Sequence, residues 1–121
     1  MKTIEDILVS LTEEEKVLLK DTIKYGCWGD SDYSFMDGEN VVTDSMYGYC
    51  TNEAKKGGHF SGRKVASMFK NIYKKVCILS RGCEGIGEVI SHCSDWWGDG
   101  SGDMLFIRKN YVDDFERWAR E

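Results

Sequence analysis

Eight of the sixteen basic side chains lie in one stretch, residues 55–81, and no acidic side chain interrupts them. The eight are Lys55, Lys56, Arg63, Lys64, Lys70, Lys74, Lys75 and Arg81. A surface helix normally mixes both signs of charge, because opposite charges three or four residues apart stabilise it. A run of one sign favours a site for phosphate groups, such as those of a nucleic-acid backbone. The plainer alternative is a solvated basic face that docks on the acidic remainder of the chain.

The glycine-rich segment 57–64 superficially resembles a nucleotide-binding phosphate loop. That motif requires Lys and then Ser or Thr after its second glycine, and Arg63 and Lys64 stand there instead. No hydrophobic strand leads into the segment, so nucleotide hydrolysis is disfavoured. A helix that begins near Ser61 would still present its amide groups, together with Arg63 and Lys64, to a single phosphate.

The chain shows no metal-binding or catalytic pattern. The acidic residues 30–39 lack the glycine and glutamate that an EF-hand needs at its sixth and twelfth positions, so turn chemistry explains them better. A zinc site from Cys77, Cys83, His92 and Cys93 is disfavoured, because structural zinc ligands usually come in close pairs. The five cysteines form no CxxC pair and fit reduced thiols. Neither His59 nor His92 has an obvious nucleophile beside it. We therefore expect no metal, no cofactor and no enzymatic activity.

The pattern of apolar residues and capping residues predicts a small α+β domain over residues 1–121, mostly helical with one β-hairpin. Helices are expected near residues 3–10, 12–25, 44–56 and 61–76, and a C-terminal helix at 111–120, capped by Asn110. Residues 26–42 are turn-rich and predict a loop, with a short strand near 33–36. Two β-type runs around the glycines of 98–102 predict the hairpin, near 86–108.

The clearest helix is 61–76. Its apolar residues recur at helical spacing and predict the core-facing side: Val65, Met68, Phe69, Ile72, Tyr73 and Val76. Its other side carries Arg63, Ser67, Lys70 and Lys74, with Lys64, Asn71 and Lys75 beside them. The basic residues should therefore lie in the solvent.

A short helix at 44–56, a glycine turn, the basic amphipathic helix 61–76 and a hairpin follow one another in an order that resembles a winged helix-turn-helix domain. The resemblance covers roughly residues 12–108 and implies that helix 61–76 enters the major groove of duplex DNA, with the wing tip at 98–102. It implies these DNA-contacting residues: His59, Ser61, Arg63, Lys64, Ser67, Lys70, Asn71 and Lys74. Arg63 would pair with guanine, Asn71 would read adenine, and the lysines would hold phosphates.

The hairpin tip is acidic, whereas a wing that contacts DNA usually carries Arg or Lys. Residues 1–54 also hold 12 acidic and 4 basic side chains. These features predict an alternative function, an acidic protein-interaction or inhibitor module of the kind found in phages and mobile elements. Such a module would dock on a host protein, possibly in its nucleic-acid groove, through Trp97, Asp99 and Asp103.

The length of 121 residues suits one domain, and the net charge of −5 argues against a binder of nucleic acid over its whole surface. No run approaches the roughly 18 apolar residues of a membrane span, and the N-terminus does not resemble a secretory signal. These features predict a cytoplasmic protein. The C-terminal helix, with Phe115 and Trp118, is the expected interface of a homodimer, although packing against its own chain is at least as plausible.

Overall fold

Two capped helices begin the fold. The computed structural model describes residues 3–37, 39–80, 90–93 and 104–121. Helix α1 (Ile4–Leu8) starts at Thr3 and α2 (Glu13–Tyr25) starts at Thr12. At each start the threonine hydroxyl accepts a backbone N–H three residues on, and that residue's carboxylate accepts the threonine N–H. Both are capping boxes, the arrangement expected where a threonine is followed three residues later by an acidic residue.

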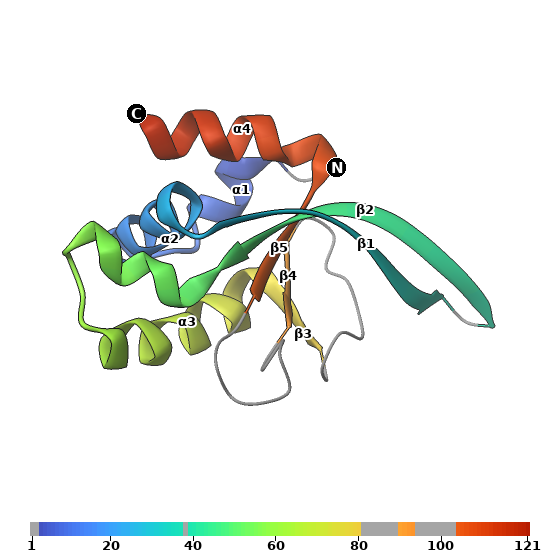
Figure 1. The fold of residues 1–121 in the computed structure, drawn as a ribbon, viewed down its shortest axis with the longest axis horizontal. Helices are drawn as coiled ribbons and strands as arrows, with labels where there is room; N and C mark the ends of the chain where they lie inside the picture. The colour runs from blue at the N-terminus through green and yellow to red at the C-terminus, as the bar shows by residue number, and fades with distance from the viewer. Residues whose placement is uncertain (1–2, 38, 81–89, 94–103) are drawn as a thin grey trace.

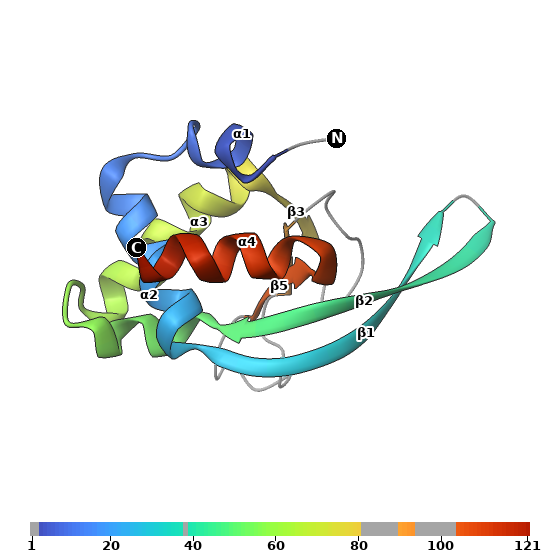
Figure 2. The same ribbon diagram turned by 90° about the horizontal axis from the view of Figure 1, so that it is seen from above.

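A long antiparallel hairpin follows α2. Strand β1 (Cys27–Asp37) and strand β2 (Asn40–Cys50) pair from Cys27–Tyr49 to Asp37–Asn40, so only two residues connect them. The helices gather at one end of the molecule, and the far part of the β1–β2 hairpin projects from the other end as an arm (Figures 1 and 2). We call residues 31–45 the arm.

The arm corrects two sequence predictions. Residues 26–42 were expected to form a loop, and 44–56 a helix, but β2 runs to Cys50 and the 3-10 helix η1 (Thr51–Gly57) follows it. The spacing of Met46, Tyr49 and Cys50 is compatible with a helix. However, the β-branched and aromatic residues of 41–49 also suit a strand, and pairing with two neighbouring strands decides between the two.

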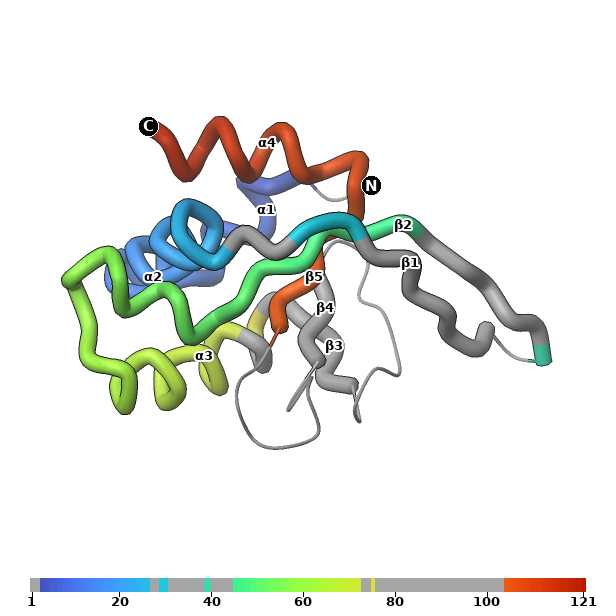
Figure 3. Tube along the Cα trace, viewed as in Figure 1, coloured from blue at the N-terminus to red at the C-terminus, as the bar shows by residue number. Residues whose placement is uncertain are grey.

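The second half of the chain alternates helices and short strands. It contains α3 (Gly62–Val76), β3 (Cys77–Ser80), β4 (Ile90–Cys93), β5 (Met104–Arg108) and α4 (Lys109–Arg120). Figure 3 follows the chain from β2 into α3. The predicted helix 61–76 is confirmed. The C-terminal helix is also present, but it begins at Lys109 with no side-chain cap, so the predicted cap at Asn110 is wrong.

The strands form one sheet in the order β1-β2-β5-β4-β3. Strand β4 pairs antiparallel with β5, from Ile90–Ile107 to Cys93–Met104, which places an antiparallel pair where the sequence predicts the hairpin 86–108. Strand β3 pairs with β4 in parallel, and β2 joins the sheet through residues 46–50. The α+β class is therefore confirmed, with a larger sheet than the single hairpin expected.

One face of the sheet packs on the helices. Tyr49 and Leu105 are opposite each other in register, and so are Tyr47 and Ile107, so these four side chains share a face. They join a cluster of helical residues that includes Leu18, Leu19, Ile23, Phe69, Ile72 and Phe115.

Within the described residues, no helix is both long enough and apolar enough to cross a membrane.

Candidate nucleic-acid interface

Helix α3 separates apolar and basic side chains onto opposite faces. Val65, Phe69 and Ile72 are at most 2% exposed and Met68 is half-buried, as predicted. Helices α3 and α4 lie on opposite sides of α2 (Figure 1). The outward face of α3 is therefore directed away from α4 and its acidic residues.

Most of the predicted DNA-contacting residues are exposed on or next to α3. This holds for His59, Ser61, Arg63, Lys64, Ser67, Lys70 and Asn71, whereas the side chain of Lys74 lies outside the described part. No acidic residue occurs within α3. Arg63, Ser67 and Lys70 fall on one stripe, because positions four and seven residues on return to the same side of a helix. Arg63 and Lys70 stand two turns apart, about 10 Å along the axis.

The start of α3 is capped as the sequence predicts. Ser61 Oγ accepts the backbone N–H of Lys64 at 3.3 Å, and the Ser61 carbonyl accepts the N–H of Val65. The N-terminus of a helix carries a partial positive charge. Its charge adds to that of Arg63, so this end of α3 is the more attractive one for an anion.

Two lysines on the flank of α3 are held by α2. Lys75 Nζ donates to Glu15 Oε1 at 2.6 Å, and Lys64 Nζ lies 3.7 Å from Glu14 Oε1. Lys64 Nζ also stands 5.5 Å from the centre of the Phe60 ring, a cation–π contact. Glu14 and Phe60 would therefore compete with a phosphate for Lys64. By contrast, Arg63 and Lys70 form no ion pair with any residue that the structure describes.

Glu15 is buried, and its ionisation is set by opposing effects. Burial of the carboxylate raises its pKa, while hydrogen bonds from Lys75 and Thr12 and the charge of Lys75 lower it, and the net pKa lies below the usual glutamate value. Glu15 is therefore an anion at neutral pH. It neutralises Lys75 and leaves the outward stripe of α3 as the accessible basic surface.

Helix η1 packs against α3 and carries two further basic residues. Lys55 and Lys56 are both exposed on it, and Lys56 pairs with Glu53. We define the basic surface as Lys55, His59, Ser61, Arg63, Ser67, Lys70 and Asn71, of which Asn71 lies at the edge that faces α2, beside Glu14, Glu15 and Lys75. The predicted DNA-contacting set omitted Lys55, which was placed in a separate helix at 44–56 and lies instead in the 3-10 helix that precedes the turn before α3.

Sequence reasoning also missed a partner of His59. His59 Nδ1 lies 2.7 Å from Oδ2 of Asp21, a carboxylate on α2 whose side chain is 6% exposed. The imidazole itself is 57% exposed. The two residues are 38 positions apart, and no local pattern in the sequence connects them.

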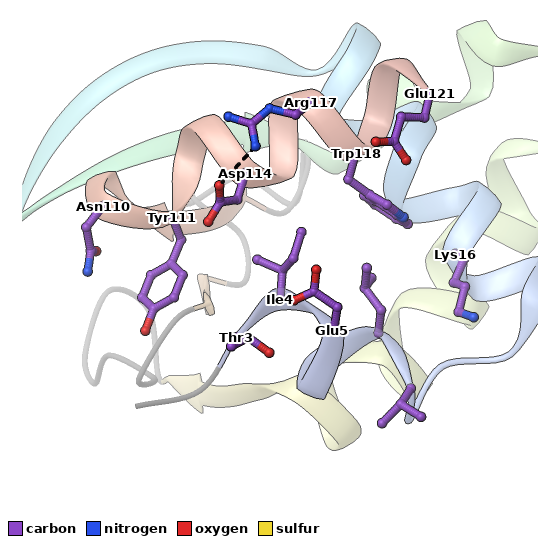
Figure 4. A pocket seen from close by; sticks show the side chains of 12 residues that line it. Thr3, Ile4, Glu5, Lys16, Asn110, Tyr111, Asp114, Arg117, Trp118 and Glu121 are labelled. Carbon is purple, nitrogen blue, oxygen red and sulfur yellow. Dashed lines mark ion pairs between the residues drawn. The ribbon is translucent and has the colours of Figure 1, made fainter.

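An apolar groove lies between α1 and α4, apart from the basic surface. It has a volume of about 830 Å³, and Tyr111 and Trp118 descend from α4 toward Ile4 on α1 (Figure 4). Phe115 is fully buried in its own chain and touches Trp118 edge-on at 6.3 Å between ring centres. Phe115 is thus a core residue and not a contact for a second copy, while the homodimer itself remains a prediction.

Other predicted features fall outside the described residues. These are Trp97, Asp99, Asp103, the wing tip 98–102 and Cys83. Among the residues that the structure describes, no three His, Cys, Asp or Glu side chains lie close enough to hold a metal ion. The helix expected at 44–56 is a strand followed by a 3-10 helix, so the first helix of a helix-turn-helix pair is replaced by η1.

Comparisons with known proteins add no family. No family model matches the chain, and the searches of curated protein sequences and of solved structures found no match.

Proposed function

We propose that this protein binds duplex DNA through the basic surface of η1 and α3. The observation that carries the proposal is the outward stripe of α3, which presents Arg63 and Lys70 with no acidic residue in the helix and no ion-pair partner for either in the described part of the chain. Exposed cations without partners lose little when they bind phosphate, because no internal ion pair has to break. Release of counterions from the DNA then supplies the affinity.

The shape of the surface supports a duplex as the ligand. An exposed α-helix fits the major groove, where each base pair presents its own pattern of donors and acceptors. On such a helix Arg63 would pair with guanine and Asn71 with adenine, while Lys70 and Lys55 would hold phosphates. Lys64 is a weaker candidate than the sequence suggests, since Glu14 and Phe60 already engage it.

The test is a titration of fluorescently labelled duplex DNA at several salt concentrations. We expect binding near 50 mM salt that weakens steeply as the salt concentration rises. The logarithm of the affinity should fall by about 0.9 per log unit of salt for each phosphate contact. The double variant R63Q/K70Q should lower this slope by about one, because Lys70 holds a phosphate, and it should weaken binding by at least tenfold, because Arg63 also loses its pairing with guanine.

A matched control removes two exposed cations elsewhere. The variant K24Q/R117Q changes the net charge equally but alters α2 and α4, away from the basic surface. We expect its affinity to stay within about twofold of that of the wild type. Absence of binding at low salt, or equal weakening by both double variants, would overturn the proposal.

The arm supports a second candidate, the protein-interaction module. Residues 27–50 contain Asp30, Asp32, Asp37, Glu39 and Asp44 but no basic residue. In residues 40–45 of β2, the strand pairs with β1 alone and has no further neighbour in the described sheet. A projecting acidic ribbon is suited to a basic groove on another protein.

A further inference from the structure

The contact between His59 and Asp21 fixes one edge of the imidazole ring. A carboxylate only accepts hydrogen bonds, so His59 Nδ1 donates to Asp21 Oδ2 across 2.7 Å. The second ring nitrogen, Nε2, lies on the opposite edge of the ring, and 57% of the side chain is exposed. When Nε2 takes up a proton, the ring becomes a cation with one N–H held by the protein and the other available to a ligand.

The turn before α3 has the geometry that this contact requires. A Cβ at Gly57 would overlap the Asp21 carboxylate, so only glycine lets the chain pass this close. Gly58 follows at φ +79°, in the left-handed region that favours glycine. The two glycines therefore let the chain pass close to Asp21, and the next residue, His59, contacts its carboxylate.

The charges around His59 come from the three elements that meet at this turn. Helix α2 supplies Asp21 and Glu14, η1 supplies Lys55, Lys56 and Glu53, and α3 supplies Arg63 and Lys64. Glu53 is paired with Lys56, and Glu14 with Lys64. Asp21 is therefore the anion that touches the ring, and more than half of the His59 side chain stays exposed just before the start of α3.

We propose that Asp21 is a positioning residue that holds His59 as a proton-dependent phosphate contact, so that nucleic-acid binding is coupled to uptake of a proton. The proposal rests on the proposed function of the basic surface. A phosphate beside Nε2 favours the charged ring, so binding favours protonation and, by linkage, protonation favours binding. Affinity must then rise as the pH falls through the range in which histidine becomes charged.

The experiment measures duplex DNA affinity and its salt dependence at about pH 6 and about pH 8. We expect wild-type protein to bind about fivefold more tightly at the lower pH near 0.1 M salt. The slope of log affinity against log salt should be steeper by about 0.9 at the lower pH, as for one added phosphate contact. A role of the pair in stability alone would not change this slope.

Three variants separate the contact from its alternatives. H59N keeps a donor near the position of Nδ1 but cannot be charged, so its affinity and salt slope should be the same at both pH values. H92N removes the only other histidine and should keep the wild-type dependence. D21N keeps a side-chain oxygen but loses the charge, so it should lose most of the increase in DNA affinity at low pH. A cooperative thermal unfolding transition shows that this variant is folded.

The outcomes distinguish this inference from the proposed function. DNA binding that does not depend on pH, or a pH dependence that survives in H59N, overturns the role of His59 and leaves the basic surface intact. A full gain at low pH in folded D21N overturns the role of Asp21. No binding at either pH overturns both proposals together.

Discussion

Glu15 links the two helices on which the basic surface depends. Its carboxylate accepts the N–H of Thr12 at 2.9 Å and the ammonium group of Lys75 at 2.6 Å, and its side chain is 6% exposed. The first contact caps α2, and the second holds the far end of α3 against it. The sequence predicts the capping box, because its partners are three residues apart. It does not predict the contact with Lys75, which spans 60 residues.

At the residue scale, E15Q should lower the free energy of unfolding by about 1–3 kcal/mol at neutral pH, since it removes a charged hydrogen bond from a buried site. The pKa of Glu15 is lowered in the folded protein, so its contribution is complete above the unfolded value, about 4.3. It is lost as the pH falls through the lower folded value. Urea unfolding followed by tryptophan fluorescence should therefore show a smaller difference between the two proteins near pH 3.

The neighbouring residue offers the control. Glu14 is exposed and lies 3.7 Å from Lys64, so E14Q should change stability by less than about 0.5 kcal/mol. Equal effects of E14Q and E15Q, or a difference between E15Q and wild type that persists in acid, would contradict the role assigned to Glu15.

At the scale of elements, the turn 57–58 sets where α3 starts and where His59 points. The sequence shows the two glycines and predicts a stop before the basic helix, which is confirmed. What precedes the turn was predicted wrongly, because a segment such as 44–50 suits either a helix or a strand until its neighbours are known. The pairing of Met46–Cys50 with β5 decides the outcome, and β5 lies more than fifty residues away.

Replacement of Gly57 tests the turn as an element. G57A would place a Cβ against the Asp21 carboxylate, so that side chain or the turn must shift and the contact with His59 is lost, at a cost of about 1–3 kcal/mol in the free energy of unfolding. G62A is the matched control, because no atom lies within 4 Å of a Cβ at the first position of α3. Thermal melts should show a loss for G57A and no loss, or a gain of up to about 1 kcal/mol, for G62A. The same melting temperature for both variants would contradict the close approach.

At the scale of the whole molecule, charge is separated between the basic surface and the arm. The sequence alone shows this separation as acidic residues 1–54 and basic residues 55–81. It also gives the α+β class, which is confirmed. It cannot show that the acidic part includes a projecting ribbon, because the period-two pattern of residues 27–50 is interrupted by glycines and serines that also suit turns.

Neutralisation of the arm tests the second candidate function. In D32N/D37N/E39Q/D44N the arm loses four charges, and a protein partner held by charge complementarity should no longer be captured from a cell lysate. The control E5Q/E13Q/D113N/D114N neutralises four exposed acids on the helices and should capture the same partner as wild type. Identical captured proteins for both variants would rule out the arm as the docking element.

The oxygen shared by Thr12 and Lys75 has a consequence for the order of folding. Both donors use Oε1 of Glu15, so the carboxylate is already fixed by its local contact once α2 forms. Fixing a glutamate side chain costs up to about 2 kcal/mol in rotamer entropy. The hydrogen bond from Thr12 offsets part of that entropy loss within α2, because its two residues are only three positions apart. We therefore expect α2 to offer Lys75 an acceptor that is already oriented when α3 packs against it.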